Sequence, residues 1–295
     1  MDYYKLADII LEWDGEAFSL LKGRYMERFR CNPEQIELKE VIRFKACLVQ
    51  LGKYTIYPIL KENHVYTMFN VNGERMLVYH WGNQRFAFAV WPERIKKGQV
   101  NECWFDPDMK NQPAINADWF FGVSGLHKAL MFHSAVILHA SYVNCNSSAI
   151  LFTAPSGTGK STQADLWRQV MHTEIVNGDR VLVRKREGKW YACGYPCCGS
   201  SQICLNRTLP LRAIVILRQG SKNRIEHLSQ AQKIRSLTVA AEVYPWDAEE
   251  MECAIDLAES IVHDITVICM SCLPNEDAVK TLNNYLEEMD HATNI

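Results

Sequence analysis

The chain has 295 residues, of which 48% are hydrophobic and 22% charged, the composition of an ordinary globular protein with length for one large domain or two modest ones. Lysine and arginine number 32 against 34 aspartates and glutamates, so the net charge of −2 gives no electrostatic reason to expect nucleic acid or an anionic membrane as partner. No apolar run reaches membrane-spanning length, and acidic residues interrupt the N-terminal apolar stretch as they would not in a signal peptide, so we expect a cytoplasmic protein.

The 11 cysteines are a high and odd number, and in a reducing cytoplasm they indicate free buried thiols. Cys269 and Cys272 form a CxxC, and a second group is clustered between Cys193 and Cys204. Neither has the second CxxC or the histidine pair that the spacing of a zinc site requires, so we predict no zinc.

The first hundred residues predict short strands and turns. Four segments are rich in β-branched and aromatic residues, namely 53–60, 64–71, 75–81 and 85–91. Asn72-Gly73 and Gly82-Asn83 are turn signals between them. The polar, proline-containing stretch 101–113 predicts a connection, so we place a β-rich N-terminal domain at 1–112 and a second domain at 113–295.

The second domain alternates between helical and strand patterns, which predicts an α/β fold. Residues 118–135 predict a buried helix or helix pair, and the apolar runs 135–143 and 149–154 predict two strands. Residues 174–194 predict a hairpin that turns at Glu187-Gly188, and 211–219 predict a further buried strand. Three helical patterns close the chain, the last beginning after Leu273 with one apolar stripe formed by Val279, Leu282, Leu286 and Met289.

The segment Ala154–Ser161, APSGTGKS, lies between a predicted strand and a predicted helix and matches the [AG]xxxxGK[ST] form of the phosphate-binding P-loop (Walker A). Glycines allow successive backbone N–H groups to face phosphate oxygens, and the helix points its positive end at the anion. Lys160 would add charge at the β- and γ-phosphates, and the Ser161 hydroxyl would bind Mg²⁺. The predicted nucleotide-binding residues are Ser156, Gly157, Thr158, Gly159, Lys160, Ser161 and Thr162.

The residues around this loop narrow the class of reaction that the protein could catalyse. The chain has neither the guanine-reading NKxD of switch GTPases nor the hydrophobic run ending in Asp-Glu of motor ATPases. A strand returning beside the loop would bring the Asp179 carboxylate near Mg²⁺ or the attacking group, and His139, at the expected end of the preceding strand, would face the same phosphates. Each has a plain structural alternative: Asp179 as a turn cap, His139 as a core histidine and Arg180 as part of a solvated strand face.

Three short motifs occur in a familiar order: Leu138–Ser141 (LHAS), Ser156–Thr162 (SGTGKST) and Asn177–Arg180 (NGDR). In this order they resemble the core shared by HPr kinase/phosphorylase and the ATP-dependent phosphoenolpyruvate carboxykinases. A G-x-P loop, Gly194–Gly199, follows as in the HPr-kinase-like proteins. The resemblance covers residues 138–218, and it implies a P-loop kinase core of this type, preceded here by a smaller β-rich N-terminal domain.

The resemblance also implies roles and cofactors, namely ATP and Mg²⁺. Lys160 and Ser161 would hold phosphates and metal, Asp179 would bind the metal or act as base, and His139 would contact the phosphoryl group or the metal. Arg180 and Arg218 are candidates to supply further positive charge to the phosphoryl group in the transition state. The related enzymes carry two adjacent acids, whereas the first of these positions is Gly178 here. The G-x-P loop is a candidate acceptor pocket, and a homo-oligomer is implied because the related kinases are often hexameric.

The leading hypothesis is an ATP- and Mg²⁺-dependent kinase whose acceptor is a hydroxyl, either a serine of a peptide or protein or a small alcohol. HPr itself stays open as acceptor, although the N-terminal region and the lost acid both favour another target. A non-catalytic nucleotide-binding module is the main alternative, and the lone Asp179 favours it. Phosphoenolpyruvate carboxykinase activity is a weaker one, because the chain is too short to hold that enzyme's additional substrate half.

Overall fold

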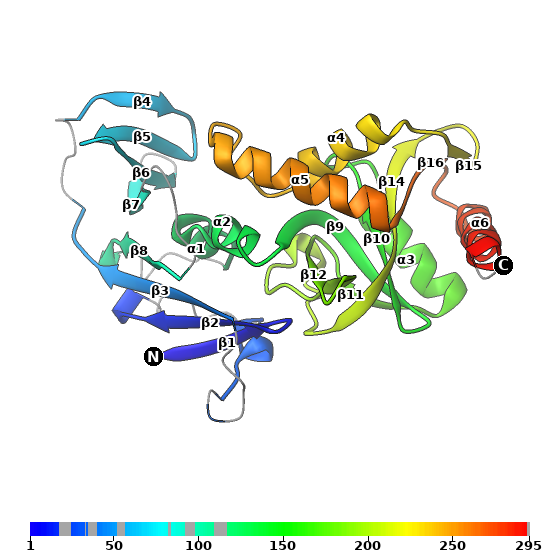
Figure 1. Cartoon of the computed structure of the whole chain (residues 1–295), viewed down its shortest axis with the longest axis horizontal. Coiled ribbons are helices and arrows are strands. Elements are labelled where there is room, and N and C mark those ends of the chain that lie inside the picture. Colours follow the sequence, from blue (N-terminus) through cyan, green and yellow to red (C-terminus); the bar gives the residue numbers. More distant parts are fainter. Residues whose placement is uncertain are drawn as a thin grey trace. The chain divides into compact units, whose positions relative to one another are not determined.

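A computed structural model describes residues 1–17, 25–32, 34, 40–51, 57–81, 84–91, 98–108 and 117–293. It divides into two compact units, Met1–His133 and Ser134–Ile295, each built on its own eight-stranded sheet (Figure 1). The chain is therefore a mixed α/β protein with two large sheets. The domain boundary predicted at 112/113 and the turn predicted at Gly82-Asn83 lie outside the described residues.

The first unit is a sheet in the order β1-β2-β3-β8-β7-β6-β5-β4. The pairs β2–β3 and β3–β8 are parallel, and the other neighbours are antiparallel. Its elements are β1 (Asp2–Leu6), β2 (Ile9–Asp14), the 3-10 helix η2 (Met26–Phe29), β3 (Val41–Leu48), β4 (Ile59–Glu62), β5 (Tyr66–Val71), β6 (Glu74–Trp81), β7 (Gln84–Trp91), β8 (Val100–Phe105), α1 (Ala117–Ser124) and α2 (Leu126–Met131).

Three of the four predicted strands are confirmed as β5, β6 and β7. Of the strand predicted at 53–60, residues 53–56 lie outside the described residues, and β4 begins at Ile59. The two-residue turn between β5 and β6 is Asn72-Gly73, whose φ angles of 53° and 90° are those that an Asn-Gly hairpin turn adopts. The polar connection predicted from residue 101 was wrong for its first part, because β8 occupies residues 100–105. In β8 the apolar side chains of Cys103 and Phe105 are buried, and the adjacent polar residues Asn101 and Glu102 mask the strand in the sequence.

The predicted buried helix pair is confirmed as α1 and α2, which are separated by Gly125 in a left-handed conformation, φ 69°. The pair packs on the sheet through aromatic rings. Phe120 lies 4.9 Å from Trp13 and stacks on Phe105 at 4.7 Å, measured between ring centroids, and Trp13 stacks on Phe44. These contacts form part of the core of the first unit.

The second unit contains a ring of paired strands, β10-β9-β12-β13-β14, in which β14 pairs back with β10; β16 and then β15 extend the sheet from β14. The pairs β10–β14 and β14–β16 are parallel. Its elements are β9 (Ala135–Cys145), β10 (Ser148–Thr153), α3 (Lys160–Met171), β11 (Glu174–Asn177), β12 (Arg180–Arg186), β13 (Lys189–Cys193), the 3-10 helix η5 (Gly199–Ser201), β14 (Thr208–Gln219), β15 (Arg224–Glu226), α4 (Gln230–Ala240), α5 (Ala248–Asp264), β16 (Thr266–Cys272) and α6 (Glu276–Thr293).

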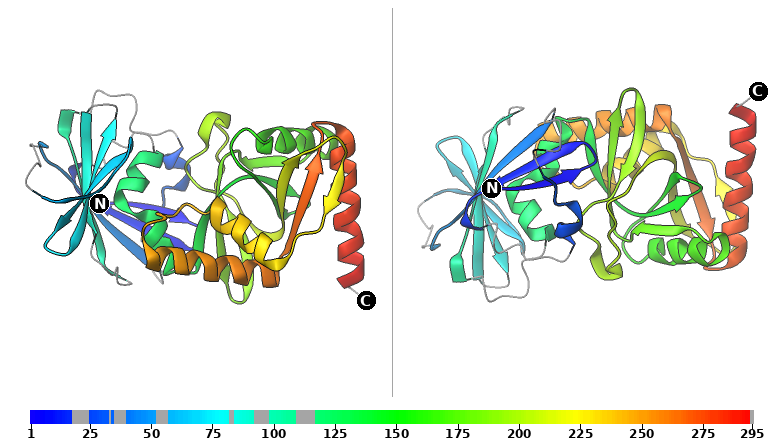
Figure 2. Two further views of the ribbon diagram at one scale, coloured as in Figure 1. Left: turned by 90° about the horizontal axis from the view of Figure 1, so that it is seen from above. Right: turned by 90° about the horizontal axis from the view of Figure 1, so that it is seen from below.

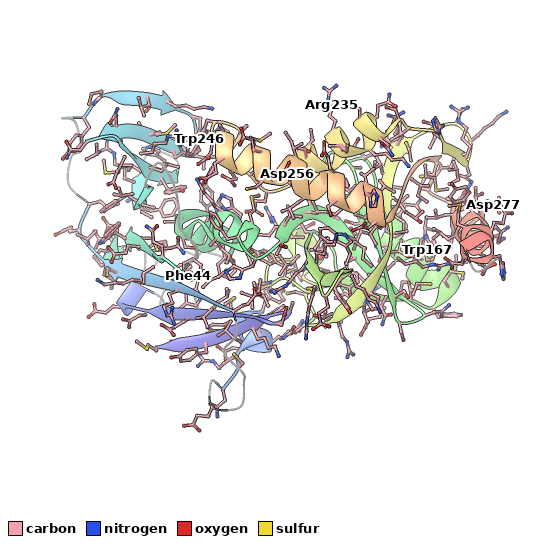
Figure 3. The ribbon with its side chains drawn as sticks, in the orientation of Figure 1. Phe44, Trp167, Arg235, Trp246, Asp256 and Asp277 are labelled. Atoms are coloured by element: carbon pink, nitrogen blue, oxygen red, sulfur yellow. The ribbon has the colours of Figure 1, made fainter. Side chains whose placement is uncertain are left out.

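Helices cover this sheet in two pairs. The helices α3 and α6 pack together around an apolar core that contains Phe152 and Trp167, and α4 packs along α5 (Figures 2 and 3). In α6, Val279, Leu282 and Leu286 of the predicted stripe are buried, whereas Met289 is 39% exposed.

The strands predicted at 135–143, 149–154 and 211–219 are confirmed as β9, β10 and β14. The hairpin of β12 and β13 turns at Glu187-Gly188 as predicted, with φ angles of 49° and 76°. The short strand β15 and the strand β16 were missed, because they lie among the three helical patterns at the end of the chain and β16 has apolar residues on both faces.

Candidate functional site

The glycine-containing loop joins the end of β10 to the start of α3. Gly157 and Gly159 have φ angles of 77° and 118°, and no atom lies within 4 Å of the place where a Cβ would stand on either. The loop backbone is therefore open. The first α3 hydrogen bond runs from the Gln163 N–H to the Gly159 carbonyl at 2.9 Å, so the N–H groups before it are left at the positive end of a 12-residue helix.

Lys160 is buried at the first position of α3, and its Nζ donates to the Ala154 carbonyl at 2.9 Å. Burial lowers the pKa of Lys160, and the charge of Asp179 raises it to a smaller extent. The cation thus stands in a place where its charge is poorly solvated, which favours an added anion.

The other predicted nucleotide-binding residues line the same loop and the first turn of α3. Ser156, Ser161 and Thr162 are exposed, and the Thr158 N–H donates to the Pro155 carbonyl at 3.3 Å. The sequence did not indicate Gln219, at the end of β14, whose Nε2 donates to the Gly157 carbonyl at 3.4 Å.

His139 and Asp179 are in contact. The His139 Nε2 and the Asp179 Oδ1 are 3.1 Å apart, and their side chains are 41% and 25% exposed. The hydrogen bond from His139 is the main cause that lowers the pKa of Asp179, with further help from the charges of Arg180 and Lys160, against an opposing effect of burial. The structure therefore places His139 and Asp179 in contact, and the charges of Lys160 and Asp179 shift each other's pKa.

The prediction that His139 ends its strand was wrong. The strand β9 continues for six more residues to Cys145, because its apolar pattern persists. His139 instead marks the place where β9 changes neighbours: it pairs with Arg180 on β12, and Ala140 pairs with Thr153 on β10. Side-chain exposure also excludes a core histidine at this position.

Arg180 lies between two carboxylates. Its Nη1 donates to the Asp179 Oδ2 at 2.9 Å and its Nε donates to the Glu242 Oε2 at 3.0 Å, so Arg180 holds Asp179 in place. Glu242 was not predicted, since it stands 62 residues from Arg180 in the sequence. Arg218 instead pairs with Glu226 on β15 at 3.1 Å, and its side chain is exposed.

Gly178 shows why a second acid is absent. A Cβ on Gly178 would lie 2.2 Å from the Ser201 Oγ and 2.3 Å from the Ser201 Cβ, far inside van der Waals contact. The Gly178 carbonyl also accepts a hydrogen bond from the Ser141 Oγ at 2.9 Å, which fixes the peptide. The side chain of Ser201 therefore fills the space that a carboxylate at position 178 would need.

The four clustered cysteines, Cys193, Cys197, Cys198 and Cys204, are buried, and the Cys204 Sγ donates to the Tyr195 carbonyl at 2.9 Å. Within the described ranges, no group of three or more His, Cys, Asp or Glu side chains is arranged to hold a metal ion. No described helix is long and apolar enough to cross a membrane.

The family model described as SynChlorMet cassette protein ScmC matches residues 108–267, just over half of the 295 residues. The chain belongs to the ScmC family. The part matching the ScmC model contains the helix pair, the loop and the His139–Asp179 pair, and it ends within β16.

Among solved structures, the HPr(Ser) kinase/phosphatase from Coxiella burnetii matches 54% of this chain and 96% of its own, with 10% sequence identity and a TM-score of 0.31. A TM-score of this size does not establish a shared fold. No curated protein sequence matches the chain.

Proposed function

We propose that this ScmC-family protein is an ATP- and Mg²⁺-dependent kinase that transfers the γ-phosphoryl group to a hydroxyl of a peptide, a protein or a small alcohol. The observation that carries the proposal is the contact between His139 and Asp179, together with the buried Lys160, on which the Asp179 charge acts, at the start of α3 behind an open glycine loop. Phosphoryl transfer needs mainly positioning and neutralisation of charge, and these residues offer a cation, a carboxylate and an imidazole.

The loop residues fit a nucleotide by their conformation. Positive φ angles at Gly157 and Gly159 leave the backbone free to approach phosphate oxygens, and the helix dipole favours an anion there. Lys160 would exchange its contact with the Ala154 carbonyl for a phosphate oxygen, and this would stabilise a buried, poorly solvated charge.

The residues present also fit Mg²⁺, which is commonly held by one or two carboxylates together with substrate phosphates and water. Ser161 and Asp179 would be its protein ligands, and the metal would supply neutralisation of the phosphate charge. Because its pKa is lowered, Asp179 stays ionised at neutral pH, as a metal ligand must be. His139 and Arg180 keep the two carboxylate oxygens oriented.

In the transfer itself the acceptor oxygen forms a bond to the γ-phosphorus while the bond from that phosphorus to the bridging oxygen of ADP breaks. The hydroxyl proton leaves toward Asp179, which accepts a hydrogen bond from it in the loose transition state. A carboxylate of low pKa is a weak base, but it orients the acceptor hydroxyl well by accepting its hydrogen bond. A proton transfer that occurs late in the reaction does not require a stronger base.

The test is ADP formation from ATP and Mg²⁺ in the presence of serine peptides or small alcohols. We expect the Asp179→Asn variant to lose on the order of 10²-fold or more in rate, as for removal of a positioned acid–base group. Asp165→Asn is the matched control, because Asp165 is a carboxylate on the exposed face of α3 that pairs with neighbouring Arg168. Full activity of Asp179→Asn would refute the role of this carboxylate.

A non-catalytic nucleotide-binding module remains the second candidate, favoured by Gly178 and by the ties of Asp179 to Arg180. Calorimetry separates the two. ATP binding that depends on Lys160, combined with no ADP formation with any acceptor, would support the module and contradict the kinase.

A further inference from the structure

Asn177, the last residue of β11, joins two parts of the site. Its side chain is fully buried at 0% exposure. Its Oδ1 accepts hydrogen bonds from the backbone N–H of Asp179 at 2.9 Å and of Arg180 at 3.0 Å. Its Nδ2 donates to the carbonyls of Tyr195 at 2.8 Å and Cys197 at 2.9 Å. Both amide hydrogens and both oxygen lone pairs are therefore used.

The loop Tyr195–Ser201, whose carbonyls accept the hydrogen bonds from the Asn177 Nδ2, also packs directly against Asp179. A Cβ on Gly199 would lie 2.8 Å from the Asp179 Cγ, so the loop backbone rests against the carboxylate itself. Ser201 fills the space above Gly178, and its Oγ is held by donating to the Cys198 carbonyl at 2.6 Å. The loop is thus fixed to the carboxylate segment by Asn177 and by direct packing.

We infer that Asn177 is a positioning residue that joins the Asp179 segment and the loop Tyr195–Ser201 into one unit, so that the wall of the acceptor site and its carboxylate keep a fixed distance. The inference rests on the proposed function for the role of Asp179 and for the loop as the acceptor site. The structural coupling is independent of turnover, and this allows it to be tested separately. Because these four hydrogen bonds of the Asn177 side chain all go to backbone groups, Asn177 acts through its neighbours.

The first experiment is hydrogen exchange, followed by mass spectrometry, on the full chain carrying Asn177→Asp. The substitution keeps the Oδ1 acceptor but sets a second oxygen against two carbonyls. We expect peptides from 195–203 to exchange at least about tenfold faster, since buried acceptors lose their donors, while α6 exchanges as in the wild type.

Asn223→Asp is the matched control. Asn223 also bridges two segments, with its Nδ2 donating to the Asn275 Oδ1 at 2.9 Å and its Oδ1 accepting from the Leu273 N–H at 2.8 Å. We expect Asn223→Asp to leave the exchange of 195–203 unchanged. Unchanged exchange of 195–203 in Asn177→Asp, or an equal increase throughout Ser134–Ile295, would overturn the inference.

A second variant perturbs the same unit at a loop residue, Ser201, and keeps the inference testable if Asn177→Asp does not fold. Ser201→Ala removes the bond to the Cys198 carbonyl while Asn177 is intact. If the two segments form one unit, the amides of Asp179 and Arg180 also exchange faster. Exchange of these amides at the wild-type rate would show that the segments are uncoupled and would overturn the inference.

A kinetic measurement then tests whether the coupling of the two segments affects the binding and phosphorylation of the acceptor. In an active enzyme, Asn177→Asp raises the KM for the hydroxyl acceptor and lowers kcat, with the KM for ATP unchanged, because the glycine loop is untouched. An equal rise in both KM values would contradict a positioning role. Faster hydrogen exchange confined to the loop, in a protein without any kinase activity, would support the coupling of the two segments. The kinase proposal would then fail in its own test, ADP formation.

Discussion

Gly178→Ala gives the sharpest test of the contact that excludes a second acid. Gly178 has no positive φ angle, so alanine causes no backbone strain, and its cost comes from the added methyl group alone. That methyl would lie 2.3 Å from the Ser201 Cβ and 2.2 Å from its Oγ. Relief requires a shift of Ser201 by more than about 1 Å, as carbon atoms in contact are about 3.5–4.0 Å apart.

The expected loss of stability follows from the cost of overpacking a confined space. Inserting a methyl group into a filled space costs about 1–3 kcal/mol in the free energy of unfolding. At about 2–4 °C per kcal/mol for a unit of this size, the Tm of the second unit should fall by roughly 2–12 °C. Ser201→Gly removes both clashing atoms and leaves the nearest remaining atom, the Ser201 Cα, at 3.9 Å.

The assay is scanning calorimetry of the full chain for the two single variants and the double variant. Since Ser201→Gly makes room for the alanine, the double variant should be more stable than the sum of the single effects by about 1–3 kcal/mol. Gly122→Ala in α1 is the control, because its Cβ meets no atom within 4 Å and alanine favours the helix. Wild-type stability of Gly178→Ala, or additive effects in the double variant, would refute the reasoning.

Three further predictions follow from the second unit. Lys160→Met should weaken ATP binding at least about tenfold in calorimetry, since it removes the charge at the loop; unchanged affinity would contradict nucleotide binding there. Asp179 has a lowered pKa, so its ionised form stabilises the folded state at neutral pH and this contribution is lost as the pH falls through the folded pKa. The stability difference between wild type and Asp179→Asn should therefore shrink in urea unfolding between pH 7 and about pH 3, and a constant difference would disprove it. Trp167 is fully buried with its Nε1 unpaired, so Trp167→Ala should cost about 3–5 kcal/mol and Trp167→Phe much less; equal losses in thermal unfolding would contradict this.

Much of the local structure could be predicted because its causes are local. Segments rich in β-branched and aromatic residues indicated β5 to β7, and Asn72-Gly73 and Glu187-Gly188 indicated the turns. The loop before α3 follows from its glycines, whose conformational freedom depends little on the rest of the chain. Strands such as β8 and β16 were missed since their stability comes from partners far along the chain.

The sequence by itself determined the mixed α/β character, the open glycine loop and the three residues His139, Lys160 and Asp179 as candidates. Tertiary structure alone decided how they meet: the register that sets His139 opposite Arg180 brings His139 to the Asp179 carboxylate. It also decided that Ser201 fills the space at Gly178 and that Asn177 joins the carboxylate to a distant loop. Side-chain patterns report the backbone near them, whereas such contacts depend on strand register and loop packing between segments that no local pattern relates.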